Sequence, residues 1–154
     1  MKRVMVESPF VGDLVLNAAY VKACIYDSLL RGEAPFASHV IYPHALDDTK
    51  PDERKWGIEA GYTWGEISHE IAIYTDLGMS GGMSQAQKWY QTRGMLFSYR
   101  SLLESYVWKT VYRNQFHRDF PWTIDPKNVD QGAIKWLKTA ILNSRFNHDG
   151  SRAE

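Results

Sequence analysis

The first forty residues change from a strand pattern to a helix pattern and back, and this restricts the fold more than any other feature of the chain. Residues 3–7 form an apolar run that stops before Pro9, as expected for a buried strand, because proline cannot continue a central ladder. The next segment has helical apolar spacing, with Asp13 as a typical N-cap and Gly32 as a typical stop. Residues 34–38 then indicate a second short strand. This order predicts a right-handed βαβ unit.

The alternation of strands and helices continues through the first hundred residues. An apolar run at 71–74 indicates another buried strand, and the helical spacing after Pro51 indicates the helix that precedes it. We therefore expect an α/β protein with a flavodoxin-like or Rossmann-like three-layer parallel sheet of about four to five strands. The remaining expected segments are a long loop at 39–50, a helix from 82 to about 92 and a strand at 95–99.

The last third of the chain has a different pattern. It is rich in aromatic residues and helical from 102 to about 117, a second helix is indicated from 125–126, and the residues from Asn147 onward are expected to be frayed. We expect residues 1–102 to form the α/β domain. Residues 103–154 are expected to form a helical extension that packs on the core or at an oligomer interface.

The composition excludes several classes of protein. Lys+Arg and Asp+Glu number 18 each, so the basic excess of a phosphate-neutralising nucleic-acid binder is missing. Cys24 is the single cysteine, which suits a reducing compartment. Neither a signal-peptide pattern nor an apolar stretch of ~20 residues is present. We expect a cytoplasmic protein without membrane or nucleic-acid partners, whose 14% aromatic residues line a pocket or a subunit interface.

Small, polar and acidic residues follow three of the expected strands. In an open parallel sheet the ligand lies beyond the carboxyl ends of the strands, so these residues should meet at one edge. Within the turn at 78–82, glycines would let backbone N–H groups approach an anion next to a helix N-terminus; the alternative is a tight turn without a ligand. The residues expected to bind ligand are Ser8, Pro9, Phe10, Gly12, Asp13, Ser38, His39, Asp48, Ser80, Gly81 and Gly82.

Two carboxylates are candidate catalytic residues. Asp76 ends a strand, where it would bind sugar hydroxyls, act as an acid or cap the next turn. Glu59 lies in a helix between Gly57 and Gly61, and each such glycine costs roughly 1 kcal/mol relative to alanine. Close packing or the approach of a ligand would explain these glycines, and Glu59 is either a site residue or purely structural.

Other chemistries lack their usual motifs. His39 and His44 lie near aspartates, but a compact ligand spacing such as His-Glu-x-x-His is missing, so we expect neither a metal nor a cofactor. The phosphate-binding P-loop, the Gly-x-Gly-x-x-Gly fingerprint and a Ser-His-Asp motif are missing too. P-loop hydrolysis and ordinary dehydrogenase chemistry are therefore not expected.

Several motifs in order resemble the nucleoside 2-deoxyribosyltransferase-like family. They are residues 7–13, which read Glu-Ser-Pro-Phe-Val-Gly-Asp, and the segments 32–39, 46–48, 57–61 and 76–83. The nearest branch is an uncharacterised one that is frequent in bacteriophages and actinobacteria. The resemblance covers about residues 1–102, and its last segment adds Met83 to the expected ligand-binding residues.

This resemblance implies a sheet ordered 2-1-3-4 in a homo-oligomer, a dimer or larger, whose neighbours complete each other's sites. It also implies a nucleoside or nucleotide as ligand, with the serine and glycines at the start of the third helix around a 5′-phosphate. In the characterised relatives a glutamate attacks the anomeric carbon, which is covalent catalysis by a carboxylate. A phage-encoded member would work in the host cytoplasm.

The sequence departs from the family at the nucleophile. Where the family carries this glutamate, the present chain has Ala86, and alanine cannot attack a sugar. We therefore expect either an N-glycosidic-bond enzyme that uses Glu59 or Asp76, or a non-catalytic nucleotide binder such as a sensor or a phage protein that sequesters a nucleotide signal. A third possibility is an interaction module that uses the aromatic extension.

Overall fold

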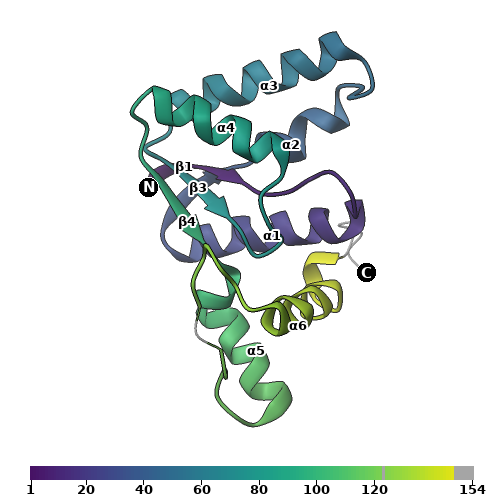
Figure 1. The fold of residues 1–154 in the computed structure, drawn as a ribbon, viewed down its shortest axis with the longest axis vertical. Helices are drawn as coiled ribbons and strands as arrows, with labels where there is room; N and C mark the ends of the chain where they lie inside the picture. The colour runs from purple at the N-terminus through teal and green to yellow at the C-terminus, as the bar shows by residue number, and fades with distance from the viewer. Residues whose placement is uncertain (123, 148–154) are drawn as a thin grey trace.

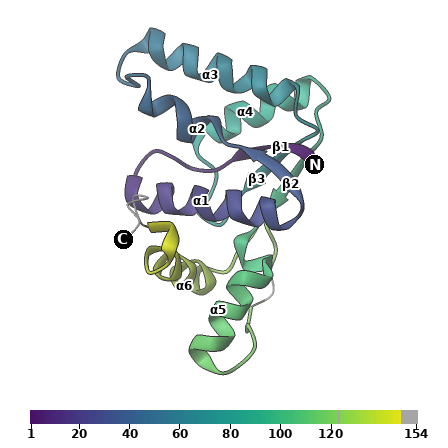
Figure 2. The same cartoon turned by 180° about the vertical axis from the view of Figure 1, so that it is seen from behind.

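A four-stranded parallel sheet forms the centre of the molecule. The computed structural model describes residues 1–122 and 124–147, and its strand order is β2-β1-β3-β4 (Figures 1 and 2). All three strand pairs are parallel, so the expected α/β fold is confirmed. The strands are β1 (Lys2–Glu7), β2 (Glu33–Phe36), β3 (Glu70–Tyr74) and β4 (Phe97–Arg100).

The central strands are buried on both faces, which explains their continuous apolar sequences. Val4, Met5 and Val6 of β1 are 0% exposed, and β3 beside them is buried from Ile71 to Tyr74. Proline is tolerated at Pro35 because β2 is an edge strand of the sheet.

Helices cover both faces of this sheet and complete three layers. Helix α1 (Leu14–Leu30) lies on one face with α6 (Gln131–Leu142), and α2 (Ser38–Ile41), α3 (Pro51–Glu66) and α4 (Gly81–Thr92) lie on the other (Figures 1 and 2). Asp13 caps α1 as expected, accepting a hydrogen bond from the Leu16 amide at 3.0 Å. Gly32 follows α1 with a φ of +76°, a backbone conformation that favours glycine.

Several expected segments differ from the structure. Helix α2 begins at Ser38, in the segment predicted as a strand, and continues into the loop predicted at 39–50. The same loop contains the 3₁₀ helix Tyr42–His44, whose turn is closed by backbone bonds to the Tyr42 carbonyl. The last helix begins later than predicted, since Asp130 rather than Asp125 caps it, accepting hydrogen bonds from the next backbone amides. Most of the end that was expected to be frayed, residues 148–154, lies outside the described residues.

The helical extension packs on the α1 side of the sheet. It begins with the 3₁₀ helix Leu102–Glu104, continues in α5 (Tyr106–Phe116) and ends with α6 and the 3₁₀ helix Arg145–Asn147. Leu103 and Leu137 are 0% exposed and belong to the same apolar core as Val4 and α1. The extension therefore completes the hydrophobic core of the sheet domain.

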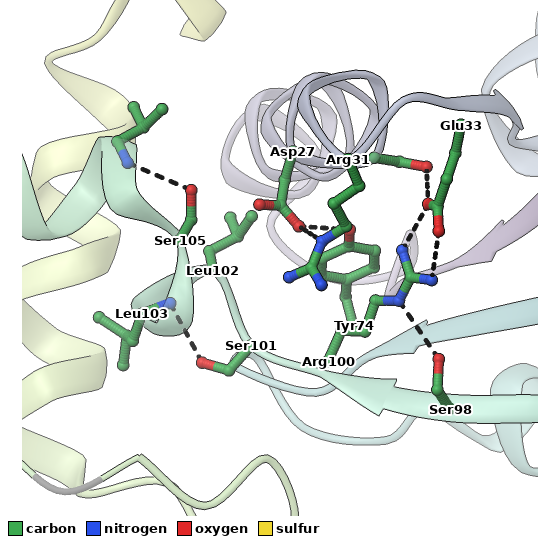
Figure 3. Close-up of polar contacts among 12 residues, drawn as sticks. Asp27, Arg31, Glu33, Tyr74, Ser98, Arg100, Ser101, Leu102, Leu103 and Ser105 are labelled. Carbon is green, nitrogen blue, oxygen red and sulfur yellow. Dashed lines mark hydrogen bonds and ion pairs between the residues drawn. The ribbon is translucent and has the colours of Figure 1, made fainter.

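A buried charge network joins three strands and α1 on this same face (Figure 3). The Arg100 guanidinium donates to both carboxylate oxygens of Glu33, at 2.7 and 2.9 Å. It also lies 3.1 Å from Glu70. Ser28 of α1 donates to Glu33 at 2.6 Å. Burial opposes ionisation of Glu70, but hydrogen bonds from Lys2, Ser98 and Arg100 prevail and lower its pKa to about 2.

Among the described residues, the helices are all too short or too polar to cross a membrane.

Candidate functional site

A cavity of about 360 Å³ lies at the carboxyl end of β1, on the face of the sheet that carries α2, α3 and α4. Its volume falls within the range of about 300–1,000 Å³ that is typical of small-molecule sites. The cavity brings together most of the residues predicted to bind ligand. Of these, it is lined by Ser8, Phe10, Ser38, His39, Asp48, Ser80, Gly81, Gly82 and Met83.

Three residues predicted to bind ligand lie outside this lining. Pro9 is buried next to it, and Gly12 turns the chain toward α1 with a φ of +107°. The Asp13 carboxylate is occupied as the N-cap of α1. In the structure these residues shape the loop that carries Ser8 and Phe10 into the cavity.

Asp76, a predicted catalytic residue, is enclosed by protein donors. It is 3% exposed and accepts hydrogen bonds from the Tyr20 hydroxyl at 2.7 Å, from the Leu102 amide at 2.9 Å and from the Ser101 hydroxyl. Burial raises the pKa of Asp76 in spite of these donors. The carboxylate does not line the cavity and joins the end of β3 to the start of the extension.

Glu59, the other predicted catalytic residue, points away from the cavity. Its side chain is 60% exposed and lies 3.8 Å from Lys55 on the outer side of α3. The flanking Gly57 and Gly61 line the cavity and are also closely packed. A Cβ at Gly61 would lie 2.8 Å from the Ser38 hydroxyl, and one at Gly57 would lie 3.2 Å from Leu46.

Glu7, which was not predicted as a site residue, supplies a carboxylate inside the cavity. It ends β1, lines the cavity, and accepts a hydrogen bond of 3.3 Å from the Tyr90 hydroxyl. Burial raises the pKa of Glu7 to about 7, against the opposing effect of this hydrogen bond. At neutral pH the protonated and ionised forms are therefore both populated. A charged residue directly after the apolar run at residues 4–6, at the carboxyl end of the strand, was the sequence signal for it.

Tyrosines from α3 and α4 form the wall beside Glu7. Tyr90 is 1% exposed, and the Tyr62 ring meets it edge to face at 5.9 Å. Tyr62 also stacks on Trp89, with 4.4 Å between the ring centroids. Burial, followed by the nearby charge of Glu7, raises the pKa of Tyr62. Both tyrosines are therefore neutral at physiological pH.

A serine and a histidine form a second polar feature of the cavity. The Ser8 hydroxyl lies 2.8 Å from His39 Nε2, and the Phe10 ring lies against the edge of the imidazole, with the ring centroids 6.0 Å apart. Burial lowers the pKa of His39 to about 4, so the imidazole is uncharged at neutral pH. This pair can exchange hydrogen bonds with an uncharged group such as a sugar hydroxyl.

The N-terminus of α4 forms the end of the cavity that suits an anion. Ser80 caps the helix by accepting a hydrogen bond from the Met83 amide at 3.2 Å. The Gly81 and Gly82 amides belong to the first turn, where backbone donors have no acceptor within the helix and the dipole favours negative charge. Ala86, one turn further along, also lines the cavity.

Besides Glu7, the described charged residues that line the cavity are exposed to solvent. Arg54 and Asp48 line it from exposed positions in and before α3. The described residues contain no group of three or more His, Cys, Asp or Glu side chains that would hold a metal ion.

Comparison with protein families shows a match over most of the α/β domain. The family model described as "Domain of unknown function (DUF7768)" matches residues 2–100, which include the whole sheet and helices α1–α4. Comparison with curated proteins and with solved structures gives no match.

Proposed function

The chain belongs to the DUF7768 family, whose description assigns no activity, and from the geometry of the site we propose that it cleaves the N-glycosidic bond of a nucleoside or nucleotide bound in the cavity, with Glu7 as the reacting carboxylate. The observation that carries this proposal is the half-buried carboxylate of Glu7, which shares one cavity with a helix N-terminus. The resemblance to nucleoside 2-deoxyribosyltransferase-like proteins supports the same class of reaction.

The contents of the cavity suit the parts of a nucleotide. The Gly81 and Gly82 amides would receive a phosphate, because the helix N-terminus offers unpaired donors and a favourable dipole. The neutral pair of Ser8 and His39 would bind sugar hydroxyls. The glycosidic carbon would then lie near Glu7.

The chemistry follows from the ionised form of Glu7. Ionised Glu7 attacks the anomeric carbon as the carbon–nitrogen bond breaks, the base leaves with the bonding pair and takes up a proton from water where it needs one, and a glycosyl–enzyme ester forms. Water or a second base then displaces the carboxylate, as in retaining glycosidases. Because attack requires the ionised form, turnover should increase as the pH rises through about 7.

The experiment is an assay of base release. The protein is incubated with a panel of nucleosides and nucleoside monophosphates, and free base is measured by chromatography. We expect turnover that Glu7→Gln abolishes, whereas Glu59→Gln, a matched change on the outer side of α3, leaves it unchanged.

Two results would count against the proposal. The first is a complete panel without free base, and the second is turnover that survives Glu7→Gln but is lost in Glu59→Gln. The second result would return the catalytic role to the residue predicted from the sequence.

A second candidate function is binding without catalysis, as in a nucleotide sensor or a protein that sequesters a nucleotide signal. It is favoured by Ala86, an inert residue of the cavity wall at the position where the resembled family carries its glutamate. Tight binding of a nucleotide by calorimetry, with the ligand recovered intact, would support this alternative over the enzyme.

A further inference from the structure

Two carboxylates line the cavity, and they differ in their surroundings. Asp48 is exposed in the segment before α3, where water solvates its charge. Glu7 lies deeper, at the end of β1. Among residues 1–122 and 124–147, no lysine or arginine forms an ion pair with Glu7, and its hydrogen bond comes from Tyr90.

An unpaired carboxylate in such a place makes the cavity attractive to positive charge. Removing a carboxylate from water is costly unless an opposite charge compensates it. Tyr62, which lines the cavity and stacks on Trp89, adds to this preference, because an aromatic ring attracts a cation. Arg54 also lines the cavity, but it is exposed on α3 and, among the described residues, forms no ion pair with Glu7. The deep part of the cavity therefore suits a ligand group that brings a positive charge to Glu7.

Among the described residues that line this region, none is well placed to donate a proton to a leaving base. Asp76 is enclosed by Tyr20, Ser101 and Leu102 outside the cavity. His39 is uncharged at neutral pH, and burial raises the pKa of Tyr90 far above the range in which a phenol acts as an acid. A neutral base needs protonation before it departs, whereas a base that already carries positive charge at its glycosidic nitrogen leaves without it.

We infer that the substrates are nucleotides whose base is positively charged at the glycosidic nitrogen, as in pyridinium nucleotides, and that Glu7 selects this charge in the aromatic end of the cavity. This inference rests on the proposed function.

The reaction balances without a further reagent. Ionised Glu7 forms a bond to the anomeric carbon as the carbon–nitrogen bond breaks, and the bonding pair neutralises the charge on the departing base. Water then attacks the anomeric carbon, Glu7 leaves as a carboxylate, and the proton of the water passes to solvent. The products are the neutral base, the sugar phosphate and one proton.

The test compares two ligands that differ in charge but hardly in shape, nicotinamide mononucleotide and its reduced dihydro form. Their phosphates are the same, so phosphate binding and phosphate ionisation cancel in the comparison. Binding of both is measured by calorimetry at pH 8, with nicotinamide release followed by chromatography. The proteins are the wild type, Glu7→Gln and Glu59→Gln.

We expect the wild type and Glu59→Gln to bind the cationic form roughly tenfold or more tightly than the reduced form, as a close pair of opposite charges implies. We expect Glu7→Gln to bind both forms about equally and to release no nicotinamide. Because glutamine has the size of glutamate, this variant should retain the fold, and circular dichroism checks that it does. Tyr62→Leu should reduce the preference for the cationic form several-fold, because it removes an aromatic ring that attracts a cation. This second variant tests the inference without changing the carboxylate.

Other outcomes of this experiment would overturn the inference, and some would overturn the proposed function too. Equal binding of both forms by the wild type, or a preference that persists in Glu7→Gln, would overturn the inference. If monophosphates with neutral bases are cleaved and nicotinamide mononucleotide is not, the inference fails while the proposed function stands. If the protein binds no nucleotide of either kind, the proposed function fails as well.

Discussion

At the scale of single residues, the ionised carboxylate of Glu7 lowers the free energy of unfolding, and other interactions of the fold compensate for this. Its ionised form is disfavoured because the strand end, Tyr62 and Tyr90 exclude water from it. When the pKa of an acid is raised in the folded state, the folded protein binds the proton of that acid more tightly than the unfolded chain does. Stability should therefore decrease as the pH rises from about 4.5, the ordinary value, to about 7.

Glu7→Gln should remove this loss. We expect the variant to be more stable than the wild type at pH 8, on the order of 1–3 kcal/mol, with the difference vanishing below about pH 4.5. Urea unfolding at several pH values measures it. A variant that is less stable than the wild type at pH 8 would show that the carboxylate is favourably paired.

The contrast between Glu7 and Glu59 shows what the sequence could and could not reveal about the site. The strand-end rule pointed to the segments that carry Ser8 and His39, and both residues line the cavity. The role of Glu7 depends on Tyr90, which lies more than eighty positions away along the chain. Sequence spacing alone does not reveal such a long-range neighbour.

At the scale of elements, the packing of α3 on α4 fixes the wall beside Glu7. Gly57, Gly61 and Gly65 recur every four residues and mark the inner side of α3. Glu59 is two positions from Gly57, about 200° around the helix axis, which places it on the opposite side. This stripe was visible in the sequence and could have excluded Glu59 from the cavity.

Gly65→Ala tests that packing. A Cβ there would lie 2.3 Å from the ring of Tyr90, so the ring or the helix has to move. We expect a loss of about 1–3 kcal/mol despite the better helix propensity of alanine, corresponding to a Tm lower by several degrees. Gly81→Ala is the matched control for stability, because its Cβ would meet nothing within 4 Å. Equal Tm values for the two variants would contradict the packing.

The strands were easier to predict from the sequence than the start of the last helix. The strands were predictable because buried parallel strands are continuous apolar runs, as in Val4 to Val6. The start of α6 was placed too early because Asp125 and Asp130 are both plausible caps. The structure uses Asp125 in a turn with the Lys127 amide instead.

At the scale of the whole molecule, the Arg100 network couples the strands to α1. Arg100→Met would leave Glu33 and Glu70 without their buried cation, which typically costs about 3–5 kcal/mol. Arg113→Met is the control, since Arg113 and Asp119 are both exposed and such pairs contribute about 1 kcal/mol or less.

The pH dependence of this effect follows from Glu70. Its pKa is lowered in the folded state, so the stabilisation is present above the ordinary value near 4.5 and is lost as the pH falls toward about 2. The difference between the wild type and Arg100→Met should therefore shrink over that range in urea unfolding. A difference independent of pH would mean that packing, rather than charge, accounts for the loss.

Exposed apolar side chains on and beside α3 offer a surface on which the predicted homo-oligomer can be tested. On α3, Trp56 is 60% exposed and Trp64 is 46% exposed, and Ile67 just beyond the helix is 52% exposed. Large exposed apolar side chains in one region are typical of subunit interfaces. We expect light scattering to show a dimer or larger species that Trp56→Lys weakens, and a wild-type monomer would refute it.

The most direct test of the central claim is a crystal structure of the Glu7→Gln variant with an uncleaved nucleotide. We expect the phosphate to lie at the Gly81 and Gly82 amides and the anomeric carbon to lie about 3–3.5 Å from the side chain at position 7. A nucleotide bound with its glycosidic bond far from position 7, or bound outside this cavity, would contradict it.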